Sequence, residues 1–401
     1  MAQQRPIRHA EKMRRKAMER KHLLAAKGGR MDVPFLLLTL MLTGIGLVML
    51  FSASFPSAFY ETGGSNPAYY FKRQAIFAAM GLAGMVVAAK FNYQRWRGAA
   101  RMLLIFSLFL LMLVIIPGIG IYINGSRRWL GIERVFTFQP SEIAKLAVII
   151  YFADSISKKR EKMLLFREGV TPYLVILGVI AILMMLEPHL SGTILIVGTG
   201  AIMMAVGGMD GRLVGLGVGG VAALAVLFVK LVEKGVISYG ASRITMWHDP
   251  WLDMSDDGYQ MVQSLIAIGS GGLLGLGLGK GRQKFLYLPE EHNDFIFAVV
   301  CEELGLVGAC VIMLIFAMLL LRGFWIALHA RDRFGTLLVV GIMSHLGLQV
   351  FLNIAVVSGL VPATGISLPF FSYGGTALLL QLVEMGIVLS VSRQIPAPRN
   401  G

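Results

Sequence analysis

Residues 33–51 read V-P-F-L-L-L-T-L-M-L-T-G-I-G-L-V-M-L-F and contain no charged side chain. As a helix, this stretch is about 28 Å long, close to the roughly 30 Å of hydrocarbon in a bilayer. Of the 401 residues in the chain, 56% are hydrophobic and 15% are charged. A soluble domain has roughly 45–50% apolar and about 25% charged residues. The sequence therefore predicts an integral membrane protein and excludes soluble, disordered and disulfide-rich secreted classes.

Further apolar runs are long enough to cross a bilayer, and they lie at 71–89, 99–117, 170–187, 190–206, 213–232, 296–320, 335–357 and 370–392. A shorter run, 140–154, is also predicted to span, although it carries Glu142 and Lys145. The run 261–279 contains six glycines, and each glycine costs about 1 kcal/mol in a helix. It is predicted to be a re-entrant or interfacial helix. The predicted fold class is an all-α integral membrane protein with about ten transmembrane helices.

The distribution of basic residues predicts the orientation of these spans. With ten spans and residues 1–32 in the cytosol, 25 of the 37 Lys and Arg residues lie on the cytosolic side, as the positive-inside rule requires. Counting 261–279 as a span weakens this asymmetry. We therefore expect a ten-span membrane domain over 33–392, a short cytosolic tail over 393–401, and an extracellular loop over 233–295 between spans 7 and 8.

The first segment, 1–32, is a basic tail that holds ten of the 37 Lys and Arg residues. It is longer than the charged start of a signal peptide and lacks a small-residue cleavage site. A basic segment beside a membrane span is attracted to anionic lipid by about 1 kcal/mol per basic residue. The net charge of +14 therefore predicts contact with membrane lipids and not with nucleic acid.

The predicted outer loop 233–295 is too long to be a simple connection. It is rich in acidic side chains, namely Asp249, Asp253, Asp256, Asp257, Glu290, Glu291 and Asp294. The spacing does not match an EF-hand. By chemistry alone, three interpretations remain open: a solvated acidic loop, another kind of calcium-binding loop, and a general base at a site that faces the lipid.

Glu142 and Lys145 are three residues apart, so they share one face of a helix. Charged side chains at membrane depth are costly, and they usually face a polar cavity or each other. Two interpretations follow from the spacing. The residues form an ion pair that fixes helix packing, or they line a substrate cavity and orient a catalytic loop.

Five segments resemble the SEDS family, the shape, elongation, division and sporulation polymerases of bacterial cell walls. They are N-G-S-R-R-W-L (124–130), F-Q-P-S-E-I-A-K-L (138–146), D-P-W-L-D with G-Y-Q-M-V-Q-S (249–264), L-P-E-E-H-N-D-F-I-F-A (288–298) and N-I-A-V-V-S-G-L-V-P-A-T-G-I-S-L-P-F-F-S-Y-G-G-T (353–376). The resemblance covers the chain from the first span to the last. Asn293 stands where the family usually has threonine. The F-F-S-Y-G-G ending favours the FtsW and sporulation branch over the RodA branch.

The resemblance implies a peptidoglycan glycosyltransferase that polymerises glycan strands from lipid II, an undecaprenyl-pyrophosphoryl disaccharide-pentapeptide. In this reaction the 4-hydroxyl of an acceptor sugar attacks the anomeric carbon of the donor, and undecaprenyl pyrophosphate leaves with inversion. A base must take the hydroxyl proton, and the leaving pyrophosphate needs a positive charge nearby.

The family's loop aspartate matches Asp253, which is the expected base. Lys145, Arg243 and Arg127 are the expected phosphate ligands, with Glu142 positioning Lys145. A divalent cation, Mg or Mn, is an alternative source of positive charge. Other polar side chains in the matched segments are expected to bind substrate, namely Gln260, Gln263, His292 and Asp294.

The resemblance further implies a location in the bacterial cytoplasmic (inner) membrane. The implied partners are lipid II, the nascent glycan strand, a class B penicillin-binding protein that supplies the transpeptidase, and other division or elongation proteins. Two rival classes remain: a lipid II flippase and a non-enzymatic division scaffold. Because only 8 of the 23 Asp and Glu residues lie on the predicted cytosolic side, the sequence favours chemistry at the outer face over a transport path.

Overall fold

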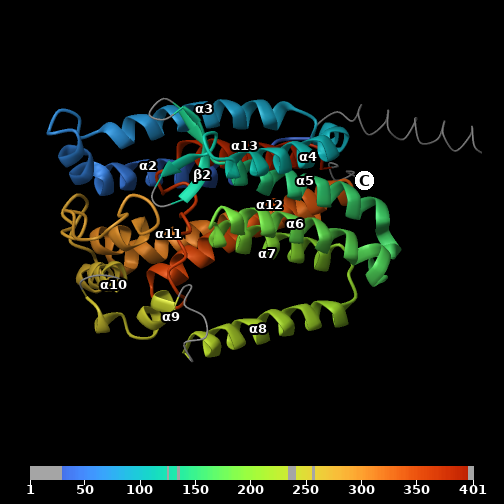
Figure 1. Ribbon diagram of the computed structural model, residues 1–401. Helices are drawn as coiled ribbons and strands as arrows, with labels where there is room; N and C mark the ends of the chain where they lie inside the picture. The colour runs from blue at the N-terminus through green and yellow to red at the C-terminus, as the bar shows by residue number, and fades with distance from the viewer. Residues whose placement is uncertain (1–28, 124–125, 133–135, 234–240, 255–257, 396–401) are drawn as a thin grey trace, which may run out of the picture.

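The computed structural model describes residues 29–123, 126–132, 136–233, 241–254 and 258–395, and most of the chain is helical (Figure 1). The long helices are α2 (Val33–Glu61), α3 (Tyr69–Lys90), α4 (Trp96–Ile115), α5 (Pro140–Lys159), α6 (Thr171–Leu186), α7 (Leu190–Val206), α8 (Gly211–Glu233), α11 (Ile296–Leu328), α12 (Arg333–Val357) and α13 (Gly375–Ser392). The shorter helices are η1 (Tyr93–Arg95), η2 (Arg160–Leu164), η3 (Phe166–Val170), α9 (Ala241–His248), η4 (Pro250–Leu252) and α10 (Tyr259–Gly271).

Each run that was predicted to span a bilayer lies on one of the long helices. Within the described residues, seven helices are long and apolar enough to cross a membrane by length and composition, and α7 is slightly shorter. A multi-pass helical membrane protein is therefore confirmed, whereas the count of ten spans stays a prediction. Most of the predicted tails 1–32 and 393–401 lies outside the described residues.

Two predicted runs are shorter as helices than the sequence indicated. The run 370–392 is helical only from Gly375. The glycine-rich run 261–279 is helical only up to Gly271, and the positive φ of Gly272 and Gly275, +55° and +80°, ends the helix there. A non-spanning conformation for this run agrees with the density of glycines.

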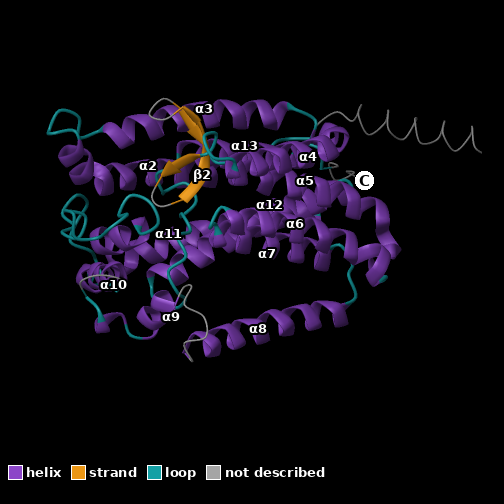
Figure 2. Cartoon of the chain, in the orientation of Figure 1, coloured by secondary structure: helices purple, strands orange, loops and turns teal. Residues whose placement is uncertain are grey.

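The all-α prediction is wrong in one segment, the connection between α4 and α5. It forms a three-stranded antiparallel sheet of β1 (Ile121–Ile123), β2 (Ser126–Ile132) and β3 (Phe136–Phe138), in that order (Figure 2). β-Branched and aromatic residues favour strands, and the buried Leu130 packs with Leu110 and Val114 of α4. Apolar packing on one face thus stabilises the sheet. The sequence did not predict this sheet, because its strands contain no long apolar run.

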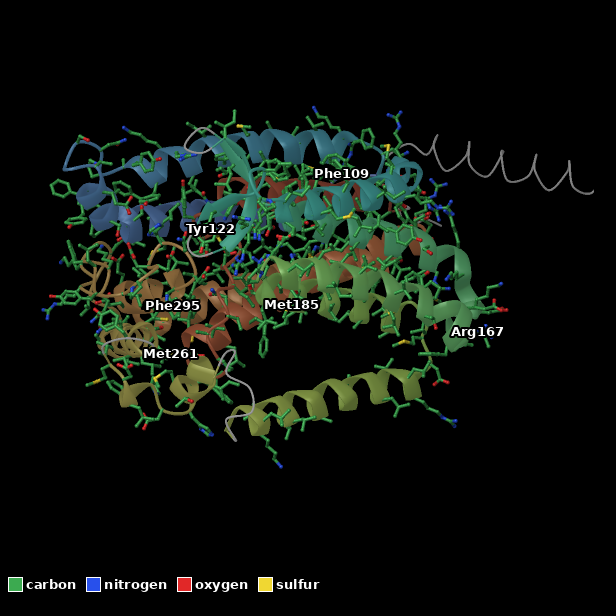
Figure 3. The ribbon with its side chains drawn as sticks, viewed as in Figure 1. Phe109, Tyr122, Arg167, Met185, Met261 and Phe295 are labelled. Atoms are coloured by element: carbon green, nitrogen blue, oxygen red, sulfur yellow. The ribbon has the colours of Figure 1, made fainter. Side chains whose placement is uncertain are left out.

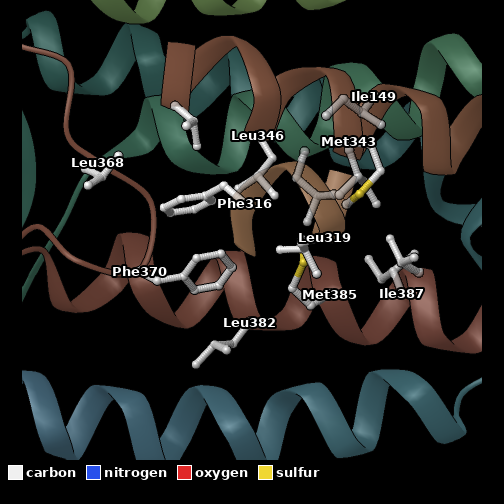
Figure 4. Close-up of a cluster of buried hydrophobic side chains, with 14 of the residues drawn as sticks. Ile149, Phe316, Leu319, Met343, Leu346, Leu368, Phe370, Leu382, Met385 and Ile387 are labelled. Carbon is white, nitrogen blue, oxygen red and sulfur yellow. The ribbon is translucent and has the colours of Figure 1, made fainter. Parts of the chain in front are cut away.

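The core of the bundle lies between α5, α11, α12 and α13. Figure 4 shows Ile149, Leu319 and Met385 meeting from three of these helices. The rings of Phe316 and Phe370 stack with their centroids 6.3 Å apart. The bundle therefore buries helix faces against one another, as well as presenting apolar side chains outward to lipid.

Several helix ends are joined by ion pairs at one end of the bundle. Arg322 of α11 pairs with Asp32 at 2.9 Å, and the backbone N–H of Asp32 donates to Ser392 at the end of α13. Arg97 of α4 pairs with Asp154 of α5 at 3.5 Å. These contacts join the start of α2 to α11 and to the end of α13, and the start of α4 to α5.

The segment between α10 and α11 is anchored by a buried ion pair. Lys284 donates to Glu303 of α11 at 2.7 Å and to Ser52 of α2 at 2.9 Å. Ser52 in turn donates to Glu303, which also accepts the N–H of Gly279. This anchor, which we call the loop clamp, ties three parts of the chain together and fixes where the segment after α10 runs.

Candidate functional site

Glu142 and Lys145 form an ion pair on α5, with 2.6 Å between Oε1 and Nζ. The Lys145 side chain is 5% exposed and that of Glu142 17% exposed. Within the part of the chain that the structure describes, the Lys145 ammonium has no other hydrogen-bond partner. The charge of Lys145 also acts on Glu384 of α13 and His345 of α12. The charge of the pair is therefore felt by buried polar side chains of two other helices, α12 and α13.

Arg128 of β2 joins the sheet to the turn between α6 and α7. Its guanidinium donates to the main-chain carbonyl of Glu187 at 3.2 Å and to that of Pro188. These carbonyls belong to the end of α6, where backbone acceptors have no partner within the helix. In Figure 3, side-chain nitrogens gather in this area, between Tyr122 of β1 and Met185 of α6. Arg128 thus places the α6–α7 turn beside the sheet.

The side chains of this turn are buried and uncharged near neutral pH. Burial raises the pKa of Glu187 to about 8, against the opposing charge of Arg128. Burial, together with the positive charges of Arg128 and Lys145, lowers the pKa of His189 to about 3. The side-chain nitrogen Nε2 of Gln139 lies 3.3 Å from Nδ1 of His189. The turn therefore presents neutral polar groups close to the charged Lys145.

Asp294 lies just before α11, and it is also within the electrostatic reach of Arg128. Burial and the charge of Glu290 raise the pKa of Asp294 to about 6, opposed by Arg128 and His292. Asn353 of α12 donates to the Asp294 main-chain carbonyl at 2.7 Å. The structure thus brings the predicted ligand Asp294 within electrostatic reach of Arg128 and His292.

His292 is held by a second set of contacts. Its Nδ1 lies 3.2 Å from Glu291, and Ser57 of α2 donates to that same carboxylate. Its ring packs on Tyr70, with the centroids 4.4 Å apart. These contacts fix the position of the His292 side chain. Its contact with substrate stays a prediction.

Asp253 lies on a different segment from the ion pair, directly after η4, and it is half-buried. Its main-chain carbonyl accepts the N–H of Gly258 at 3.1 Å. Trp247 of α9 donates its indole N–H to the carbonyl of Gly359 at 3.0 Å, beyond the end of α12. The segment from α9 to α10 is therefore tied to the bundle, and Asp253 as the base stays a prediction.

The remaining predicted ligands are dispersed. Gln260 donates to the carbonyl of Pro289 at 3.3 Å, and Gln263 is half-buried on α10. Arg127 is exposed on β2. The side chain of Arg243 lies outside the described residues, as do Asp256 and Asp257. The roles of these residues in binding stay predictions.

Sequence reasoning missed Arg128, Gln139, His189, His345 and Glu384. Alternation along a strand could have identified Arg128, because neighbouring residues on β2 face opposite sides and Leu130, two positions on, is buried. His345 and Glu384 are single polar residues in apolar runs, and such residues tend to face a bundle interior. Gln139 lies in the segment 138–146 that resembles the SEDS family, but neither it nor His189 had a local pattern that pointed to a site.

The arrangement can bind an anionic head group. Lys145 and Arg128 supply positive charge, and the neutral side chains of Glu187, His189 and Gln139 can exchange hydrogen bonds with uncharged groups. No cluster of three His, Cys, Asp or Glu side chains suited to a metal occurs among the described residues. A divalent cation, Mg or Mn, stays an alternative source of positive charge to Lys and Arg.

The fold and its buried charges define a polytopic membrane protein with a polar site inside the helix bundle, and comparison with known proteins identifies its family. The family model for the FtsW, RodA and SpoVE cell cycle proteins matches residues 33–396. The chain belongs to this family, the SEDS family.

Two curated relatives are similar over most of their length. Stage V sporulation protein E of Bacillus subtilis (strain 168) is 44% identical, over 90% of this chain and 97% of its own. A probable peptidoglycan glycosyltransferase FtsW of Geobacter sulfurreducens is 43% identical, over 91% and 96%. The predicted leaning towards the FtsW and sporulation branch agrees with these names. Several curated relatives carry the name probable peptidoglycan glycosyltransferase FtsW, which gives the enzyme class of this chain as peptidoglycan glycosyltransferase.

Solved structures support the same assignment. One, described as a peptidoglycan synthase complex that coordinates polymerization and crosslinking, matches with a TM-score of 0.75 and 27% identity, over 90% of this chain and 98% of that chain. The rod shape determining protein RodA of Thermus thermophilus matches with a TM-score of 0.66 and 27% identity, over 92% and 98%.

Proposed function

We propose that the protein polymerises peptidoglycan glycan strands from lipid II. The observation that carries this proposal is the buried Glu142–Lys145 pair, whose ammonium has no further hydrogen-bond partner among the described residues. A buried cation whose charge, like that of Arg128, acts on the neutral His189 suits a pyrophosphate that is linked to a sugar on one side and a lipid on the other. Burial among helices suits a substrate whose lipid tail stays in the bilayer.

The reaction needs one base and one source of positive charge. Asp253 takes the proton from the 4-hydroxyl of the acceptor sugar as that oxygen attacks the anomeric carbon of the donor. The bond between that carbon and the pyrophosphate oxygen breaks, and undecaprenyl pyrophosphate leaves with inversion. Lys145 stabilises the charge on the leaving group, with Arg243 and Arg127 as further ligands, while Glu142 holds Lys145 in place.

A flippase for the same lipid is the alternative that a specific observation favours. Glu384 and His345 are buried on membrane helices, and intramembrane ionisable residues also mark transport paths. A flippase moves lipid II without breaking a bond, so it gives no reason for a single loop carboxylate to dominate activity. A non-enzymatic division scaffold likewise gives no reason for one loop carboxylate to dominate activity.

The proposed partner is a class B penicillin-binding protein. The synthase complex with a similar fold is described as coordinating polymerization with crosslinking, which are two activities. A second chain that supplies the transpeptidase therefore belongs to the proposal.

The deciding experiment is the polymerisation of labelled lipid II by the purified protein together with its transpeptidase partner. A positioned general base contributes about 10²–10⁴ in rate, so Asp253→Asn should nearly abolish glycan products while protein yield and lipid II binding survive. Asp256→Asn and Asp257→Asn are the matched controls and should be far milder. Glycan synthesis by Asp253→Asn within about threefold of the natural protein rejects Asp253 as the base.

The proposed orientation places both termini and the connection between α5 and α6 in the cytosol, with 233–295 outside. We expect an impermeant thiol reagent on intact cells to label Ser255→Cys but not Arg167→Cys, in a background where the free Cys301 and Cys310 are replaced. Arg167 lies at the opposite end of the helices from α10 (Figure 3). Labelling of Ser255→Cys only after permeabilisation reverses the assignment.

A further inference from the structure

Glu187 is a buried carboxyl group without a described partner. The residue is 1% exposed. Neither oxygen of its carboxyl group has a hydrogen-bond partner among the described residues. An unmade hydrogen bond on a buried polar group costs about 1–3 kcal/mol. Glu302 and Glu303 are equally buried, yet they accept hydrogen bonds from main-chain N–H groups. Glu187 therefore differs from Glu302 and Glu303, whose carboxylates are satisfied within the protein.

The surrounding residues do not satisfy Glu187, although they are close enough to position it. Arg128 donates to the main-chain carbonyls of Glu187 and Pro188 and so fixes the turn. Gln139 is directed to His189. The turn is thus held by its backbone, and the Glu187 oxygens keep unused hydrogen-bonding capacity.

The electrostatic environment indicates which ligand suits the turn. With a pKa of about 8 for Glu187 and about 3 for His189, both side chains are uncharged at neutral pH. Gln139 carries no charge at any pH. Lys145 is near enough for its charge to act on His189. A neutral hydrogen-bonding surface next to a cation suits a ligand that has an uncharged polar part joined to an anionic part.

We propose that Glu187, with His189 and Gln139, forms a subsite that binds an uncharged polar group of the donor sugar, a hydroxyl or an acetamide. The proposal rests on the proposed function, because it takes lipid II as the substrate. The protonated Glu187 carboxyl offers one O–H donor and keeps acceptor capacity, so it can donate to and accept from a sugar. Lys145 takes the adjoining pyrophosphate.

The test compares lipid II with a lipid that has the same undecaprenyl pyrophosphate but no disaccharide-pentapeptide. Binding of lipid II and of sugar-free undecaprenyl pyrophosphate is measured for the natural protein, Glu187→Leu and Glu187→Gln. A neutral hydrogen bond is worth about 0.5–1.5 kcal/mol, so Glu187→Leu should bind lipid II about 3–10-fold more weakly and bind undecaprenyl pyrophosphate as before. Glu187→Gln, which keeps a neutral donor and acceptor, should recover most of the loss. Glu161→Leu, an exposed site on η2, is the control.

Three outcomes overturn the subsite: no change in lipid II affinity for Glu187→Leu, an equal loss for both lipids, or a loss in Glu187→Gln as large as in Glu187→Leu. A purely structural role predicts a lower melting temperature for Glu187→Leu, whereas we expect an unchanged or higher one, because an unsatisfied buried polar group is removed. If the natural protein binds lipid II but forms no glycan, the proposed polymerase fails and the subsite stands on the binding data. If it binds neither lipid, both proposals fail.

Discussion

Within the described residues, two lysine–glutamate pairs have a buried lysine, and the surroundings of these pairs differ. In the loop clamp, Lys284 and Glu303 are 4% and 0% exposed, and Ser52 and a main-chain N–H bind the remaining atoms. In the pair on α5, Lys145 and Glu142 have no described hydrogen-bonding side chain other than each other. The first pair is complete within the protein, whereas the second has unused hydrogen-bonding capacity.

This difference separates a structural role from a binding role. A buried charge pair is stable only when additional hydrogen bonds satisfy its atoms, and the loop clamp meets that condition. In the α6–α7 turn, where the charge of Lys145 acts on His189, the carboxyl of Glu187 is also unsatisfied within the described residues. A buried cation and a buried carboxyl that both keep unused hydrogen-bonding capacity suit a site whose partners come with the substrate.

The largest expected effect on stability comes from breaking the loop clamp. Lys284→Met leaves Glu303 buried without its counter-ion, and removal of one partner of a buried pair costs about 3–5 kcal/mol. We expect a much lower melting temperature in detergent and a poor yield of monodisperse protein. A melting temperature within about 2 °C of the natural protein contradicts the structural role.

The matched control removes both charges of the loop clamp. In Lys284→Met with Glu303→Gln, no charge is stranded, and replacement of both partners of a buried pair is often close to neutral. The double variant should therefore be more stable than Lys284→Met alone. If the two are equally unstable, packing and not charge accounts for the loss.

The second prediction concerns Lys145, where we expect activity to fall more than stability. A hydrogen bond to a charged group is worth about 1.5–3 kcal/mol, so Lys145→Met should slow glycan polymerisation by about 10–100-fold. Its melting temperature should fall less than that of Lys284→Met, because Glu142 retains 17% exposure. Natural activity and natural yield in Lys145→Met contradict a role at the site.

Exchanging the two charges distinguishes the two roles that the spacing of Glu142 and Lys145 left open. The double exchange Glu142→Lys with Lys145→Glu keeps an ion pair at the same spacing on α5. If the pair only fixes packing, the exchange should restore both stability and activity. If the ammonium must lie where Lys145 places it, stability should recover and polymerisation should not.

The helical membrane architecture was predictable because each apolar run, by its own length and composition, indicates one helix without reference to the rest of the chain. The ion pair on α5 was predictable for the same reason, since i, i+3 spacing sets a shared face. The sheet between α4 and α5 was not, because its strands are three to seven residues long and depend on packing against α4. Gly275 approaches the carbonyl of Glu303 closely, which is a tertiary contact that no local pattern shows.

The site residues divide in the same way. Lys145 and Glu142 carry a local signal, whereas Arg128 and Glu187 meet only because a strand of the sheet crosses the end of α6. They lie 59 positions apart in the sequence, so their contact depends on the three-dimensional arrangement. Asp253 was selected by family resemblance, and the experiments on it proposed above are needed to assign its role.

The smallest expected effect is the pH dependence that Glu187 contributes to stability. Its folded-state pKa is about 8, above the ordinary value of 4.5, so the folded protein binds this proton more tightly than the unfolded chain. The stabilisation is therefore fully present below pH 4.5 and is lost as the pH rises through 8. Between pH 7 and pH 9 the natural protein should lose about 1 kcal/mol from this group.

Glu187→Gln keeps a neutral side chain of similar shape at every pH, so it should lack this loss. The melting temperatures of the two proteins, measured at pH 7 and pH 9, should diverge in favour of the variant at the higher pH. Glu161→Gln, at an exposed position, should follow the natural protein throughout. A constant difference between natural protein and Glu187→Gln at both pH values would mean that the carboxyl is already ionised at pH 7. The neutral surface that distinguishes the Lys145 site from the loop clamp would then be lost.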